Sequence, residues 1–128
     1  MKVSYRSQSR LGFTLVELMI VVAIIGLLAS LAVPNLARAR DTSRLNIIYN
    51  NLRVLQAAKD QWALETNQAT GAPVDDLTVL KGYVRWDTIR DVIHETYVPN
   101  PVGTPVEADL PSGASLGPYG PGAVIPAP

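Results

Sequence analysis

The chain has 128 residues, with 11 lysines and arginines against 11 aspartates and glutamates, so its formal net charge is zero. That length suits one small domain, and the balanced charge argues against a protein that binds nucleic acid by neutralising phosphates. The chain has no cysteine, which excludes a disulfide framework, a thiolate zinc site and a cysteine nucleophile. Its single histidine removes most imidazole-based metal and acid–base schemes.

The start of the chain separates into a basic stretch and an apolar stretch. Residues 1–12 are polar and contain no acid, whereas residues 13–33 are apolar with few exceptions, of which Glu17 is the only charged one. With a rise of about 1.5 Å per residue, a helix over this stretch just crosses a hydrocarbon core about 30 Å thick. The sequence therefore predicts a transmembrane helix over residues 13–34.

The residues alone leave two ordinary interpretations of this segment open. A secretory signal peptide fits the basic start, but the apolar run is longer than the roughly 7–15 residues of such a segment. A single-span anchor fits the length, but basic residues flank both ends of the run, so the positive-inside rule gives no orientation. These flanking residues are Lys2, Arg6, Arg10, Arg38, Arg40 and Arg44. Glu17 has no role in either interpretation, unless its carboxyl group reaches the interface or is protonated.

Apolar residues continue at helical spacing beyond the apolar segment. One stripe, with intervals of three, four, three and seven residues, predicts an amphipathic helix over 35–70. The stripe consists of Leu45, Ile48, Leu52, Leu55 and Trp62. Lys59 takes the remaining position and can lay its aliphatic stem along the stripe. Pro34 either ends the first helix or lies inside one continuous helix, and spacing does not decide between the two. Gly71 and Pro73 are the stop signal.

Residues 71–98 hold most of the remaining apolar side chains and predict a small globular part. Asp75 or Asp76 can cap one short helix, and Asp87 can cap a second that runs through residues 89–93. Four aromatic residues stand at spacings expected of core packing: Trp62, Tyr83, Trp86 and Tyr97.

The last part of the chain predicts little regular structure. Residues 96–98 and 102–108 can form a small β-hairpin, in which Pro105 would confine the second segment to a sheet edge. Residues 98–128 contain eight prolines and five glycines. Residues 99–128 are therefore expected to be a Pro/Gly-rich tail that wraps loosely or is partly disordered. The predicted fold class is α+β, dominated by helix.

The apolar segment resembles the N-terminus of type IV prepilins and type II secretion pseudopilins. The resemblance extends from Gly12 to Asn35, roughly a fifth of the chain. A short basic leader ends in Gly12, Phe13 follows, Glu17 is the fifth residue after the glycine, and Pro34 closes the span. The resemblance implies a pilin-like fold, in which a long N-terminal helix carries a small C-terminal domain.

The resemblance also implies roles for three residues. In that family a prepilin peptidase cuts after the glycine and methylates the new N-terminus, which implies cleavage between Gly12 and Phe13 and N-methylation of Phe13. Glu17 is implied as the filament-assembly residue, whose carboxylate meets the Phe13 amine of a neighbouring subunit. A buried carboxylate and a buried amine are each costly alone, and pairing relieves both. Gly26 and Ser30 offer small surfaces for close helix approach.

The implied protein is a non-enzymatic structural subunit of a type IV pilus-like filament or a type II secretion pseudopilus. Its implied partners are the prepilin peptidase/methyltransferase, other pilin or pseudopilin subunits, an inner-membrane assembly platform and, before assembly, membrane lipid. The implied location is the bacterial inner membrane, crossed once with the C-terminal domain outside the cytoplasm, and then a periplasmic pseudopilus or an extracellular pilus. No cofactor, metal or specific nucleic-acid site is expected. Removal of the leader leaves eight basic side chains against eleven acidic ones.

The family pattern becomes weaker beyond Pro34. The chain lacks the cysteines that close the C-terminal region of many pilins, and it lacks the Asn-Gly-x-Tyr-Pro-type stretch and the calcium loop of major pseudopilins. Four acids are therefore interpreted as solvated rather than metal-binding: Asp75, Asp76, Glu107 and Asp109. His94 is expected at or near the surface. The alternative function is a bitopic membrane-anchored interaction module that never polymerises and keeps its N-terminus.

Overall fold

The computed structural model describes residues 12–128, apart from the side chain of Trp86. The predicted leader 1–12, except for Gly12, lies outside the described residues. The chain forms two compact units, which divide between Leu36 and Ala37. Helix α1 passes through this division as one element.

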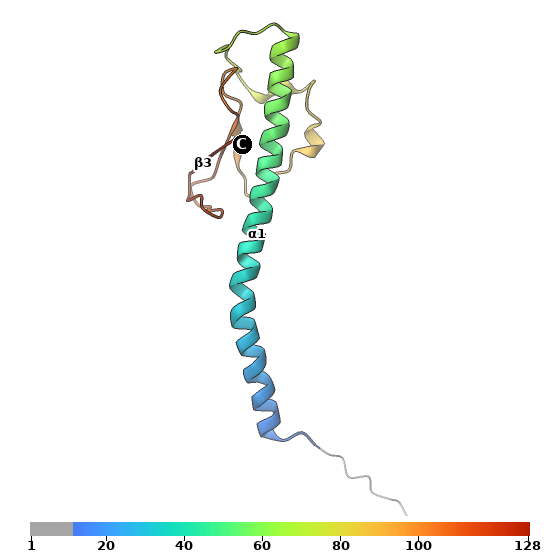
Figure 1. Cartoon of the computed structure of the whole chain (residues 1–128), viewed down its shortest axis with the longest axis vertical. Coiled ribbons are helices and arrows are strands. Elements are labelled where there is room, and N and C mark those ends of the chain that lie inside the picture. Colours follow the sequence, from blue (N-terminus) through green and yellow to red (C-terminus); the bar gives the residue numbers. More distant parts are fainter. Residues whose placement is uncertain (1–11) are drawn as a thin grey trace, which may run out of the picture. The chain divides into compact units, whose positions relative to one another are not determined.

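Helix α1 comprises Leu15–Glu65 and contains Pro34 in its interior (Figure 1). The interpretation in which Pro34 ends the helix is therefore wrong, and the continuous one is confirmed. Proline has no N–H, so Pro34 cannot donate to the carbonyl of Ser30 four residues earlier, and α1 forgoes one backbone bond here. The rest of the helical ladder continues on both sides.

The C-terminal end of α1 is closed by a Schellman motif. Asn67 adopts a positive φ of 55°, the left-handed conformation that asparagine tolerates better than most residues. The N–H of Gln68 donates to the carbonyl of Ala63 at 2.8 Å, and that of Asn67 donates to Leu64 at 3.4 Å. Helix α1 therefore ends five residues before the predicted bound at residue 70, and Asn67 ends it rather than Gly71 and Pro73.

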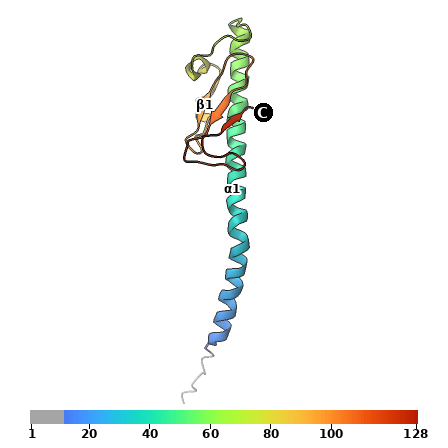
Figure 2. The same cartoon turned by 90° about the vertical axis from the view of Figure 1, so that its left-hand side faces the viewer.

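Three short strands form an antiparallel sheet beside the second part of α1 (Figure 2). They are β1 (Thr96–Val98), β2 (Glu107–Asp109) and β3 (Val124–Pro126), in the order β1-β2-β3. Tyr97 pairs with Ala108, which in turn pairs with Ile125. A hairpin that begins at residues 96–98 forms as predicted, but its second strand is Glu107–Asp109, which overlaps the predicted segment 102–108 only at its end. Strand β2 is also central rather than at an edge. Pro105 is compatible with this position because it precedes β2 and takes no part in the ladder.

The expectation that residues 99–128 lack regular structure is wrong. This segment supplies β2 and β3 and five buried core side chains: Val106, Ala108, Leu110, Leu116 and Ile125. Strands of three residues fit among the prolines and glycines, although Pro126 is itself the last residue of β3. Gly117 has a φ of 58°, and a Cβ there would lie 2.8 Å from Leu45 Cδ1, so glycine allows this segment to approach α1 closely.

The segment between α1 and the sheet contains two short 3₁₀ helices, η1 (Leu77–Leu80) and η2 (Trp86–Thr88). Asp76 caps η1 by accepting the N–H of Thr78 at 2.5 Å, as predicted. The second predicted helix, capped by Asp87 and running through residues 89–93, does not form, because Asp87 lies inside η2 and η2 ends at Thr88. Side-chain carboxylates satisfy the backbone N–H groups there, which removes the need for helical bonds.

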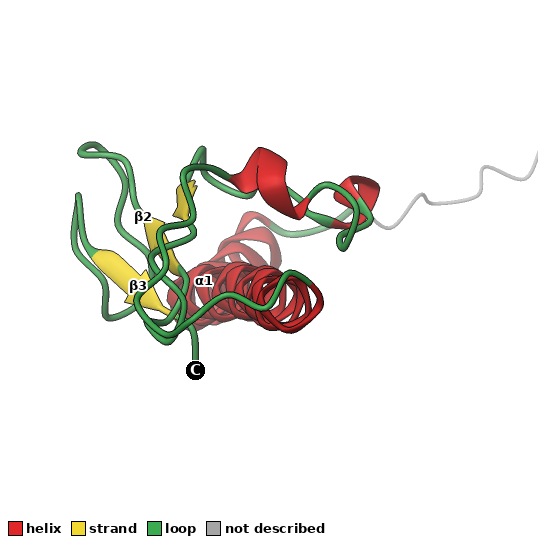
Figure 3. Cartoon of the chain, turned by 90° about the horizontal axis from the view of Figure 1, so that it is seen from above, coloured by secondary structure: helices red, strands yellow, loops and turns green. Residues whose placement is uncertain are grey.

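The core lies between one face of α1 and the sheet. The stripe residues Ile48, Leu52 and Leu55 are fully buried, and they pack in one cluster with the core side chains of the C-terminal segment. Leu45 and Trp62, at the two ends of the stripe, are half-buried. Figure 3, viewed from above, shows the strands beside α1. The apolar face of the amphipathic half of α1 is therefore buried against other segments of the same chain.

Candidate processing and assembly site

The peptide bond between Gly12 and Phe13 lies just before α1, in an exposed position. The Phe13 side chain is 92% exposed. A Cβ added at Gly12 would meet no heavy atom within 4 Å. Nothing in the described chain therefore shields this bond from a protease, and the fold itself does not require glycine at this position.

Thr14 and Glu17 form a reciprocal capping box at the start of α1. The N–H of Glu17 donates to Thr14 Oγ1 at 3.2 Å, while Glu17 Oε2 accepts from the Thr14 N–H and hydroxyl, each at 2.9 Å. The pair satisfies backbone donors that the first helical turn leaves free. Sequence reasoning missed Thr14, although threonine followed three residues later by glutamate before an apolar run is the signature of this motif.

The structure brings Phe13 and Glu17 together at one end of the helix. Both line the same apolar depression, together with Leu18, Ile20 and Val21. Both bonds from Thr14 go to Oε2 of Glu17, and Oε1 accepts no hydrogen bond from the described residues. One carboxylate oxygen can therefore serve the helix start while the other accepts a donor from outside the subunit.

The first half of α1 presents apolar side chains on every side. Its large hydrophobic residues from Leu15 to Leu36 are between 51% and 75% exposed, and the first buried residue of the helix is Ile48. Gly26 has no heavy atom within 4 Å of an added Cβ, so its small size leaves room for another helix. By length and composition, α1 is the one helix of the described chain able to cross a membrane. Such an apolar surface requires lipid or other subunits as its cover.

Lys59 is fully buried on the core face of α1, rather than only along its stem as predicted. Its ammonium group donates to the carbonyl of Pro99 at 2.8 Å, to that of Pro101 at 3.5 Å and to that of Thr104. These three oxygens belong to the loop that joins β1 to β2. A protonated amine has three donors for three acceptors, so Lys59 holds this loop against the helix.

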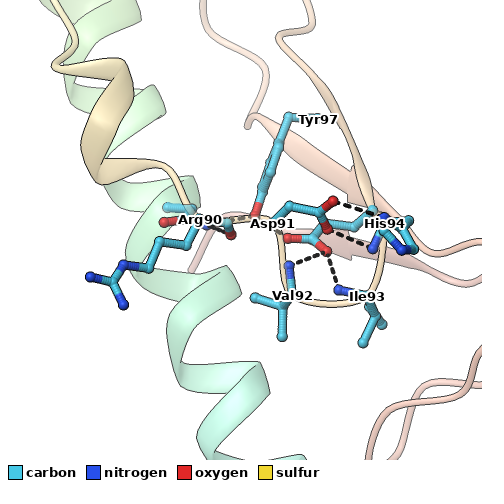
Figure 4. A network of polar contacts seen from close by, with 8 residues as sticks. Arg90, Asp91, Val92, Ile93, His94 and Tyr97 are labelled. Carbon is cyan, nitrogen blue, oxygen red and sulfur yellow. Dashed lines mark hydrogen bonds and ion pairs between the residues drawn. The ribbon is translucent and has the colours of Figure 1, made fainter.

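A second polar network joins α1 to the loop before β1 (Figure 4). Asn51, which is 1% exposed, donates to the Arg90 carbonyl at 2.9 Å and to the Tyr97 hydroxyl at 2.8 Å. That hydroxyl donates to Glu95 Oε1 at 2.7 Å. Glu95 Oε2 accepts the N–H groups of Val92 at 3.2 Å and Ile93 at 2.9 Å. Burial, together with the Glu95 carboxylate, raises the pKa of Tyr97, although its bond with Asn51 opposes the shift.

Tyr97→Phe is expected to lower the free energy of unfolding by about 1–3 kcal/mol, because it leaves one N–H of the Asn51 amide and Oε1 of Glu95 without their hydrogen-bond partner in a buried setting. Urea unfolding of the full chain in detergent micelles, followed by tryptophan fluorescence, measures the change. Tyr119→Phe is the matched control. It removes only the hydroxyl contact with Tyr49 at 3.0 Å and should cost less. Equal losses for the two variants would contradict the role given to the network.

The remaining residues singled out in the sequence do not form a site. His94 is exposed, with its Nδ1 2.9 Å from Asp91 Oδ2. In the described residues no group of three or more acidic or histidine side chains is placed to hold a metal ion. Asp76 instead caps η1, and Glu107 and Asp109 lie in β2.

Comparison with known proteins agrees with the resemblance seen in the sequence. Residues 7–33 match the family model described as the prokaryotic N-terminal methylation motif. The chain is 40% identical over 63 residues to the type II secretion system core protein G of Klebsiella michiganensis, which is 49% of this chain and 44% of that protein. It is 41% identical over 68 residues to the type IV major pilin protein PilA of Myxococcus xanthus, which is 53% of this chain and 31% of that protein.

A similar match is found with the core protein G of Pseudomonas aeruginosa, with 38% identity over 47% of this chain and 41% of that protein. No solved structure matches the chain. The fold and the N-terminal segment thus place the chain among helix-dominated α+β proteins with a prepilin-type methylation motif. The resemblance to type IV pilins and type II secretion pseudopilins is confirmed, and the chain spans less than half the length of these relatives.

Proposed function

We propose that the chain is a structural subunit of a type IV pilus-like filament or of a type II secretion pseudopilus, and not an enzyme. The observation that carries this proposal is the apolar half of α1, which residues 12–128 leave uncovered and which begins at a methylation motif. In a membrane this surface contacts lipid, and in a filament it contacts the same surface of other subunits. Small residues such as Gly26 then permit close helix packing.

The proposal assigns processing to the start of α1. A prepilin peptidase/methyltransferase cuts between Gly12 and Phe13 and methylates Phe13, and Glu17 accepts the Phe13 amine of a neighbouring subunit during assembly. The exposure of Phe13 and the open Oε1 of Glu17 support these roles. Before assembly, the subunit lies in the bacterial inner membrane with residues 37–128 outside the cytoplasm. An inner-membrane platform then transfers it into the periplasmic or extracellular filament.

The intact mass and N-terminal sequence of the protein from its host's membranes test the processing step. The expected chain begins at N-methylated Phe13. Gly12→Val should leave the leader attached, because a branched side chain obstructs an extended backbone in a protease cleft, whereas Ser9→Ala in the leader should be processed normally. A wild-type chain that begins at Met1 would support the non-polymerising anchor. One that begins at Val33, directly after the small-x-small sequence Ser30-Leu31-Ala32, would identify a signal peptide.

A further inference from the structure

Charge is unevenly distributed in residues 37–128. Residues 37–53 of α1 contain four arginines and one acid, Asp41. The arginines are Arg38, Arg40, Arg44 and Arg53. The rest of the chain, from residue 54 onward, carries nine acids against four basic residues. The basic character of the mature protein is therefore concentrated just beyond the apolar run.

The first three of these arginines, which we call the ring, are not confined to one face of the helix. At about 100° per residue, Arg40 and Arg44 are one turn apart and lie about 40° from each other around the axis, whereas Arg38 lies on the opposite side, about 160° and about 120° from them. All three side chains are exposed, and no ion pair in the described part of the chain includes them. An interface with another protein would need the charges on one side, whereas a lipid headgroup layer surrounds a helix on all sides.

The distance along the chain places Arg38 at the outer edge of a headgroup layer, and Arg40 and Arg44 beyond it but within range of its electrostatic attraction. The ring follows Val33 by five to eleven residues, or up to about 16 Å at a helical rise of about 1.5 Å per residue. Headgroups extend about 5–7 Å beyond the hydrocarbon core. Arginine side chains can reach back toward phosphates, and attraction to an anionic surface acts over a Debye length of about 10 Å.

Cleavage strengthens this asymmetry. The leader carries Lys2, Arg6 and Arg10, and proposed processing removes all three. The ring then supplies every basic side chain that flanks the apolar run, and the methylated amine remains at the other end. We infer that the ring of Arg38, Arg40 and Arg44 binds the phosphates of anionic phospholipids in the outer leaflet of the inner membrane and fixes the depth of the processed subunit before assembly. This inference rests on the membrane location in the proposed function.

The test uses the full mature chain in phosphatidylcholine vesicles that contain spin-labelled lipid. The measured quantity is the association of spin-labelled phosphatidylglycerol with the protein relative to spin-labelled phosphatidylcholine. Each arginine that binds a lipid phosphate should raise this preference about fivefold, and high salt should lower the preference. The triple variant Arg38→Gln/Arg40→Gln/Arg44→Gln should lower the preference to near one, whereas Asp41→Asn should increase it.

Arg53→Gln is the matched control, because Arg53 is exposed on the same helix but nine residues beyond the ring. It should leave the preference unchanged. A wild-type chain without preference, a triple variant that keeps it, or an equal effect of Arg53→Gln would overturn the inference. A triple variant that keeps its lipid preference but fails to enter filaments would also overturn it and identify acids of another copy as the partner. Filament incorporation is measured separately in the host. If the wild-type chain shows the lipid preference but does not polymerise, the lipid-binding role of the ring is supported and the proposed function is contradicted.

Discussion

A Glu17→Gln subunit is expected to be processed at Phe13 but to remain in the membrane, with loss of filament incorporation. Glutamine keeps an oxygen that can accept from Thr14, so the start of α1 should persist. It removes the negative charge that the Phe13 amine of a neighbouring subunit would meet in an apolar setting, where an unpaired ammonium group is costly. Membrane fractionation and immunodetection of sheared filaments measure the two pools.

Thr14→Val separates the capping role of Glu17 from its assembly role. This variant removes the Thr14 hydroxyl, which both accepts the Glu17 N–H and donates to the Glu17 carboxylate, at a cost of about 1 kcal/mol to the helix start. It keeps the carboxylate, so its subunits should still enter filaments. If Thr14→Val blocks incorporation as fully as Glu17→Gln does, the charge pair is not the reason for the effect, and the capping box is.

The sequence predicted the elements whose cause is local. The length and composition of the apolar run locate the first half of α1, and the helical spacing of the stripe through Ile48, Leu52 and Leu55 locates the second half. A cap at Asp75 or Asp76 was predicted because capping depends on neighbouring residues, and the structure assigns it to Asp76. Continuity at Pro34 was undecided, because one missing backbone bond is a small loss for a helix of 51 residues, and its neighbours decide whether the helix continues.

The elements that sequence reasoning missed depend on contacts between distant residues. Strand β3 has only three residues among prolines and glycines, and its pairing with β2 follows from the burial of Ile125 against α1. The loop at 89–95 stays irregular because Glu95 binds backbone N–H groups and is itself held by Tyr97. No pattern among neighbouring residues predicts this series of hydrogen bonds. At the candidate site the resemblance supplied Gly12, Phe13 and Glu17, while their geometry and Thr14 came from the structure.

Lys59→Ala is expected to lower the free energy of unfolding by about 3–5 kcal/mol, the largest stability change proposed for this chain. The variant leaves a cavity in the core and three loop carbonyls without their donor. Lys59→Met keeps most of the stem packing and should lose about 1–3 kcal/mol, the part that the carbonyls contribute. Lys81→Met, at an exposed lysine, should stay within about 0.5 kcal/mol of wild type. Urea unfolding of the full chain in micelles measures all three.

Two further measurements separate charge from packing at this site. Methylammonium ions should stabilise Lys59→Ala by entering the cavity beside the carbonyls of Pro99 and Thr104, and should not stabilise Lys59→Met, whose side chain fills that space.

Burial lowers the pKa of Lys59, although Asp60 opposes the shift. The unfolded chain therefore binds more protons than the folded one between the lowered pKa and the ordinary value of 10.5, and stability relative to Lys59→Met should rise with pH across that window. If Lys59→Met matches wild type and methylammonium has no effect on Lys59→Ala, the loop is held by packing and not by the ammonium group.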